Sequence, residues 1–169
     1  MDSAKKNKRP TEPRDLALYL LGFRAMSAGE LAEKLRQRDL SEESIAETIA
    51  WLIEIAYLDD LGYARDVVAH YFGRGYGPGR VRQELQKRRV PQDLWAEALD
   101  ASRPDTGAVD RFIAGKLRGE IPDKAGEKRV ADALARRGFG WDEIRAGLMR
   151  YLSGNAAGED EPDPWAVDS

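Results

Sequence analysis

The apolar residues of this chain repeat three times at an interval of about fifty residues, and this repeat constrains the fold more than any other feature. The residues in register are Leu31, Leu35, Leu40, Ile45 and Ile49, then Val81, Leu85, Val90, Trp95 and Leu99, then Val130, Leu134, Phe139, Ile144 and Leu148. Their spacing is helical, and no apolar–polar alternation is long enough for a strand. We therefore predict an all-α fold of three tandem three-helix repeats, each stacked on its neighbours in an elongated and curved arrangement.

The repeat also predicts how the chain is divided. We expect helical repeats over residues 14–58, 59–103 and 104–153. Residues 1–13 carry lysine, arginine and proline without apolar periodicity, and residues 154–169 carry five carboxylates without a basic residue. Such segments cannot bury enough apolar surface to offset the entropy of ordering, so we expect a disordered basic tail and a disordered acidic tail.

The composition argues against catalysis. The chain has no cysteine and a single histidine, which excludes thiolate and multi-histidine metal sites. The sequence also lacks a phosphate-binding loop, and His70 is predicted to be a packing or surface residue. We expect a protein that is not an enzyme and uses no cofactor or metal. Without a membrane-length apolar run or a secretory signal, it is expected in the cytoplasm, away from membranes.

The most specific segment is a glycine-rich turn followed by a basic helix that is predicted to begin near Pro78. Residues 74–89 hold six basic residues against Glu84 alone. The candidate partner-binding or DNA-binding residues are Arg74, Tyr76, Arg80, Arg82, Lys87 and Arg89. Tyr76, set between two glycines, is expected to lack a local packing partner and to act as an interface anchor. Two alternatives stay open: a solvated helix with a charged rim, and a Tyr76 ring that folds back onto its own repeat.

These residues resemble the signature of a known family. The matching stretches are Leu58-Asp59-Asp60, Tyr63-Ala64, Arg74-Gly75-Tyr76-Gly77-Pro78, Arg80-Val81 and Glu84-Leu85. They resemble the RecX family, bacterial regulators of the recombinase RecA, and the likeness covers residues 14–152. It implies a non-enzymatic protein of three tandem three-helix repeats. The positions it implies to be structural are Leu58, Asp59, Asp60, Gly75, Gly77, Pro78 and Leu85.

The resemblance also implies a partner, the RecA–DNA filament. Family members bind in the filament groove and modulate its ATPase, strand-exchange and co-protease activities, which implies inhibition here and a role in homologous recombination, DNA repair and the SOS response. A monomer with weak direct DNA contact is expected. The alternative is a helical DNA-binding regulator that acts without RecA.

One departure from the family pattern concerns the turns. Family repeats place glycine after the second helix, as Gly138 does, whereas Asp39 and Arg89 occupy the equivalent positions. We therefore expect those two turns to be shaped differently from the third.

Overall fold

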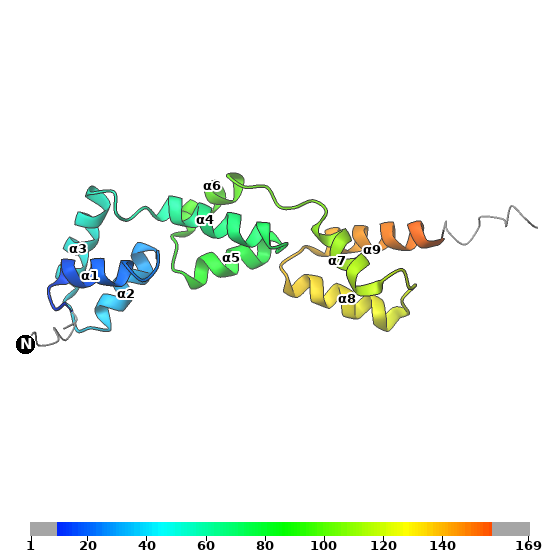
Figure 1. The fold of residues 1–169 in the computed structure, drawn as a ribbon, viewed down its shortest axis with the longest axis horizontal. Coiled ribbons are helices and arrows are strands. Elements are labelled where there is room, and N and C mark those ends of the chain that lie inside the picture. Colours follow the sequence, from blue (N-terminus) through cyan, green and yellow to red (C-terminus); the bar gives the residue numbers. More distant parts are fainter. Residues whose placement is uncertain (1–9, 157–169) are drawn as a thin grey trace, which may run out of the picture. The chain divides into compact units, whose positions relative to one another are not determined.

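The computed structural model describes residues 10–156, and every regular element in this range is a helix (Figure 1). In chain order the elements are α1 (Pro13–Leu21), α2 (Ala28–Arg36), α3 (Glu42–Glu54), α4 (Asp60–Gly73), α5 (Pro78–Lys87), the 3₁₀ turn η1 (Gln92–Leu94), α6 (Trp95–Asp100), α7 (Ala108–Leu117), α8 (Lys124–Arg136) and α9 (Trp141–Ala156). The two predicted tails fall largely outside the described residues. Helix α9 continues through residues 154–156, past the position where the acidic tail was expected to begin.

The described residues group by their contacts into two units. One comprises residues 10–69 and Arg82–Ser102, and the other comprises His70–Val81 and residues 103–156. The division passes through α4 and α5, so each of these helices contributes residues to both units.

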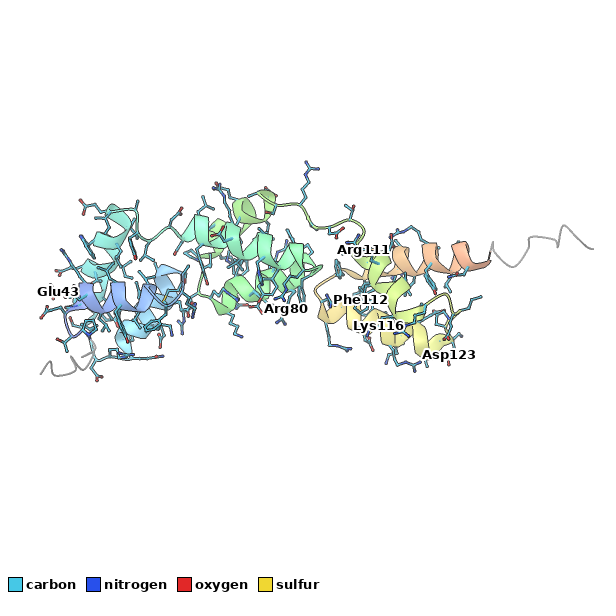
Figure 2. The ribbon with its side chains drawn as sticks, viewed as in Figure 1. Glu43, Arg80, Arg111, Phe112, Lys116 and Asp123 are labelled. Carbon is cyan, nitrogen blue, oxygen red and sulfur yellow. The ribbon has the colours of Figure 1, made fainter. Side chains whose placement is uncertain are left out.

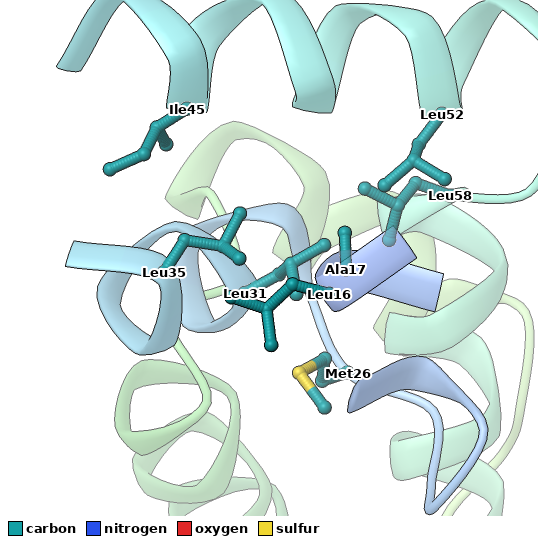
Figure 3. Packing of buried hydrophobic residues seen from close by; sticks show 8 residues of the cluster. All are labelled: Leu16, Ala17, Met26, Leu31, Leu35, Ile45, Leu52 and Leu58. Carbon is teal, nitrogen blue, oxygen red and sulfur yellow. The ribbon is translucent and has the colours of Figure 1, made fainter. Parts of the chain in front are cut away.

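The core of the first unit is aliphatic and lies among α1, α2 and α3, which pack on one another (Figure 3). Its buried residues are Leu16, Ala17, Met26, Leu31, Leu35, Ile45, Leu52 and Leu58. Leu58 precedes α4 in the chain yet packs in this core, which accounts for an apolar residue at that position. Burial of these side chains is the main force that holds the three helices together.

The core of the second unit lies among α7, α8 and α9. Its buried residues are Ala108, Val109, Ile113, Val130, Leu134, Phe139 and Ile144. The two cores use the same register, because Leu35 on α2 and Leu134 on α8 are both fully buried. Leu85, the equivalent residue on α5, is also fully buried. These positions confirm the all-α fold of three tandem three-helix repeats.

The turns that follow α2, α5 and α8 share one backbone conformation. Asp39, Arg89 and Gly138 have φ angles of 60°, 54° and 91°, all in the left-handed region. The expectation that the first two turns would be shaped differently is therefore wrong. In each turn the left-handed residue donates its N–H to the helix three residues earlier: Asp39 to Arg36 O at 3.1 Å, Arg89 to Gln86 O at 2.9 Å and Gly138 to Ala135 O at 2.9 Å. After α5 and α8 the next residue also bonds to the helix, because the Val90 N–H donates to Leu85 O at 3.1 Å and the Phe139 N–H donates to Leu134 O at 3.3 Å. A left-handed residue at this position lets the chain turn back onto the preceding helix, and Asp39 and Arg89 adopt this conformation although neither is glycine.

The start of a second helix lies against one of these turns in each unit. In the first unit, a Cβ added at Gly29 would lie 2.7 Å from the carbonyl oxygen of Arg89. In the second, a Cβ at Gly79 would lie 3.0 Å from the carbonyl oxygen of Gly138, and the Gly79 N–H donates to that oxygen. Glycine permits this close approach in both places. On α8, the residue in register with Gly29 and Gly79 is Lys128.

Asp59 and Asp60 fix the start of α4. The Gly62 N–H donates to Asp59 Oδ1 at 3.0 Å, which caps the helix as expected of a carboxylate at this position. Asp60 accepts a hydrogen bond from the Ala28 N–H at 2.7 Å, so its carboxylate lies at the N-terminus of α2. Asp60 therefore links the first two repeats within the first unit.

The Asp60 contact predicts a pH-dependent stability. Burial raises the pKa of Asp60 above its ordinary value, and the hydrogen bond from Ala28 opposes that effect. Because the folded state holds the proton more tightly than the unfolded state, the stability of the wild type relative to Asp60→Asn should fall as pH rises through the ordinary aspartate pKa of about 3.9 and above it. Urea unfolding at several pH values measures this difference.

At neutral pH, Asp60→Asn should be at least as stable as the wild type, because an amide oxygen still accepts the Ala28 hydrogen bond without a buried charge. Asp60→Ala, which removes the acceptor, should be less stable than Asp60→Asn by about 1 kcal/mol. Equal losses for the two variants would show that the charge matters more than the hydrogen bond.

Candidate functional site

The six residues predicted to bind a partner or DNA do not form one cluster within either unit. Arg74, Tyr76 and Arg80 belong to the second unit, while Arg82, Lys87 and Arg89 belong to the first. The side chains of Arg74, Arg82, Lys87 and Arg89 are exposed, and those of Tyr76 and Arg80 are half-buried. Arg89 also lies 3.7 Å from a carboxylate oxygen of Glu33. Which of these residues contact a partner stays a prediction.

Tyr76 has packing partners, contrary to the expectation that its flanking glycines would leave it without any. Gly75 has a φ of 74°, and this left-handed residue turns the chain so that the Tyr76 N–H donates to Tyr71 O at 3.1 Å. The Tyr76 ring then lies edge-on to the Tyr71 ring, with centroids 5.4 Å apart, and the guanidinium of Arg137 lies 4.9 Å from its centroid. Tyr76 therefore folds back and pins the turn.

The motif residues around this turn have structural roles. Pro78 is the first residue of α5, and the Gly77 N–H donates to Arg137 O at 2.9 Å. A Cβ at Gly77 would overlap the backbone of Gly138, so only glycine fits this approach. Helix α5 therefore starts against the end of α8 within the second unit.

Two grooves gather arginine side chains. The first, called here the Arg88 groove, has a volume of about 320 Å³ and lies in the first unit. Its lining residues are Arg24, Ala25, Glu30, Tyr63, Lys87 and Arg88.

Carboxylates neutralise both arginines of the Arg88 groove. Arg24 forms a two-point ion pair with Glu30, which raises the pKa of the Arg24 guanidinium above its ordinary value. Arg88 pairs with Glu84, one turn earlier on α5, and also donates to the carbonyl oxygen of Glu84 at 3.2 Å. Glu84 is buried, as an acid is when it is paired. Burial raises the pKa of Tyr63 at the same place.

The second groove, the Arg137 groove, has a volume of about 350 Å³ and lies in the second unit. Its lining residues are Gly73, Arg74, Gly75, Asp105, Ala108, Arg111, Phe112 and Arg137. Arg111 pairs with Asp105. An adjoining hollow shares Arg111 and Phe112 with this groove and adds Gly115, Lys116 and Arg118. Figure 2 labels Arg111, Phe112 and Lys116 on α7.

Arg137 is held by aromatic rings. Its guanidinium lies 4.9 Å from the Tyr76 centroid and 5.1 Å from the Phe112 centroid, and Nη1 donates to Gly75 O at 3.5 Å. Lys116 Nζ lies 5.7 Å from the Phe112 centroid. Cation–π contacts of this kind orient a cation without neutralising its charge.

Arg137 falls in register with Arg38 and Arg88, but it was not among the residues predicted from the sequence to bind a partner. Arg111, Lys116 and Arg118 were not predicted either. The available signal was the contrast between repeats at equivalent positions: Arg88 has Glu84 four residues earlier, whereas Arg137 has Ala133. An ion pair of the kind that neutralises Arg88 is thus unavailable to Arg137.

No group of three or more histidine, cysteine or acidic side chains among residues 10–156 could hold a metal ion. Likewise, none of the described helices is both long and apolar enough to cross a membrane.

Comparison with known proteins agrees with this architecture. The family model for the first three-helix domain of RecX matches residues 14–52, and the model for the second matches residues 59–99. The crystal structure of RecX from Lactobacillus salivarius superposes with a TM-score of 0.73 at 22% identity, covering 83% of this chain and 95% of that chain. At this identity the likeness concerns the fold.

Curated relatives match over most of their length. Regulatory protein RecX of Stenotrophomonas maltophilia strain R551-3 is 35% identical over 144 residues, which cover 83% of this chain and 88% of the relative. Regulatory protein RecX of Chlorobaculum tepidum is 31% identical over 166 residues, which cover 96% of this chain and the whole relative. With its first two three-helix domains matched in order and its relatives matched across a third repeat, the chain belongs to the RecX family.

Proposed function

We propose that this protein binds the RecA–DNA filament and inhibits its ATPase, strand-exchange and co-protease activities. The observation that carries the proposal is the match, over most of both chains, to relatives named regulatory proteins. The choice of the RecA filament as the partner rests on the resemblance of the Arg74–Leu85 segment to the family signature. A binding role also suits a chain whose described residues offer charged grooves and surfaces.

The chemistry of α5 supports an acidic partner. Arg82 and Lys87 are exposed on this helix, and neither forms an ion pair with another described residue. Cations presented in this way attract an acidic nucleoprotein surface and increase the rate of association with it.

The direct test measures RecA ATPase on single-stranded DNA with and without substoichiometric amounts of this protein. We expect hydrolysis to fall in proportion to the protein added. If RecA hydrolysis is unchanged while the protein binds DNA, the alternative of a DNA-binding regulator that acts without RecA is favoured.

A charge-reversal variant tests the predicted surface of α5. Arg82→Glu combined with Lys87→Glu should raise the concentration needed for half-maximal inhibition by roughly tenfold or more, because it reverses two charges that face an acidic partner. Its melting temperature should hardly change, since exposed substitutions usually alter stability by less than about 0.5 kcal/mol.

The matched control reverses two other exposed arginines, Arg38→Glu with Arg103→Glu, and carries the same change in net charge. This control should inhibit RecA like the wild type. Equal loss in both double variants would show that net charge alone acts, and full activity of the α5 variant would remove α5 from the interface.

A further inference from the structure

The Arg88 groove and the Arg137 groove are equivalent sites in successive repeats. With the offsets of 50 and 49 residues that align the apolar cores, Arg24 corresponds to Arg74, Tyr63 to Phe112 and Arg88 to Arg137. Each set lines its own groove within its own unit. The two grooves therefore share an arginine pair and an aromatic ring at equivalent positions.

The carboxylates are what differ. In the Arg88 groove, Glu30 pairs with Arg24 and Glu84 pairs with Arg88. The same offsets place Arg80 at the position of Glu30 and Ala133 at the position of Glu84. As a result, among residues 10–156 no carboxylate forms an ion pair with Arg74 or Arg137.

Positive charge continues along α7, where Arg111 pairs with Asp105 and no described carboxylate pairs with Lys116 or Arg118. The five cations that line the Arg137 groove and its adjoining hollow, called here the cationic strip, are Arg74, Arg111, Lys116, Arg118 and Arg137. Together, the linings of the Arg137 groove and its adjoining hollow contain one acid, Asp105. This concentration occurs in a chain whose formal net charge is −3, so it does not follow from overall composition.

We propose that the cationic strip binds the phosphodiester backbone of a nucleic acid, whereas in the equivalent Arg88 groove glutamates neutralise both arginines and leave Lys87 as a single exposed cation. Four of the five cations are arginines, whose planar guanidinium groups match phosphate oxygens. From Arg111 to Arg118, the residue that follows α7, the helix axis rises about 10 Å, roughly the axial rise of three nucleotides in one strand of a duplex at 3.4 Å each. The rings of Tyr76 and Phe112 hold Arg137 in place before the ligand arrives.

This inference deepens the proposed function by giving the chain a nucleic-acid contact of its own, and it can fail independently. The sharpest variant is Ala133→Glu, which supplies the carboxylate that Glu84 supplies to Arg88, in the same i, i+4 relation to Arg137. The matched control is Ala133→Gln, which has nearly the same size and no charge. Neither variant removes a residue of the strip.

Binding to a labelled single-stranded oligonucleotide, followed by fluorescence anisotropy at several salt concentrations, is the measurement. Ala133→Glu should bind about tenfold more weakly than Ala133→Gln, and its slope of log K against log salt should be shallower by about 0.7, the value for one lost phosphate contact. Equal binding by the two variants would overturn the proposal. Should neither variant fold, Arg74→Gln with Arg118→Gln, both at exposed positions, provides the same test against the wild type.

Polyglutamate of matched charge distinguishes a nucleic acid from an acidic protein surface. The proposal requires that the wild type prefer the oligonucleotide, and equal affinity for the two polymers would overturn the assignment to nucleic acid. RecA ATPase measured on the same variants separates this proposal from the proposed function. Loss of oligonucleotide binding with RecA inhibition retained would support the strip as a nucleic-acid site and leave the filament contact to another surface.

Discussion

Replacing Gly138 with alanine is expected to destabilise the second unit by more than about 3 kcal/mol. Gly138 has a φ of 91°, which alanine adopts only with strain, and an added Cβ would overlap the Arg80 backbone nitrogen and lie 2.7 Å from Arg80 Cβ. Backbone strain and overpacking each cost about 1–3 kcal/mol. Urea unfolding followed by circular dichroism measures the loss.

The matched control is Asp39→Gly at the equivalent turn after α2, where φ is 60°. Glycine relieves the left-handed strain of Asp39 but adds freedom to the unfolded chain, so stability should stay the same or rise by up to about 1 kcal/mol. A loss of stability in this control would mean that the Asp39 side chain itself supports the turn.

Leu134→Ala is expected to cost about 2–5 kcal/mol, because this side chain is fully buried in the core of the second unit. The loss should be local, since stacked repeats depend chiefly on their neighbours. Amide hydrogen exchange should therefore show reduced protection in α7, α8 and α9, with α1, α2 and α3 remaining close to wild type.

Leu35→Ala is the matched variant, since Leu35 occupies the same register position in the first unit and is equally buried. It should reduce protection in α1, α2 and α3 and leave α7, α8 and α9 protected. If either variant loosened both cores to the same extent, the two units would have to unfold as one cooperative block.

Most of the fold could be predicted from the sequence because burial imposes a periodic pattern on apolar residues. Leu35, Leu85 and Leu134 occupy one register position and are all fully buried. The turn conformations could not be predicted from residue type, because Asp39 and Arg89 adopt a left-handed φ without being glycine, and each donates its N–H to the preceding helix. Residue preference was the weaker influence at these two positions.

The candidate site was less predictable, because charge has no periodicity that reveals its partners. The six basic and aromatic candidates share one stretch of sequence, yet they divide between two contact units. The environment of Tyr76 depended on Arg137, a residue 61 positions later in the chain. What distinguishes Arg137 from Arg88 is a carboxylate that one repeat has and the next lacks, which only an aligned comparison of repeats reveals.

The glycines that admit a neighbouring turn at Gly29 and Gly79 have a consequence for how such a protein could evolve in length. A Cβ at Gly29 would already be too close to the next turn, and the corresponding residue of the third repeat is Lys128. Duplication of a repeat after residue 156 would therefore not extend the array until Lys128 had also been replaced by glycine. An array that packs in this way can therefore be lengthened only together with a change at Lys128, although the apolar pattern of its repeats would allow another copy.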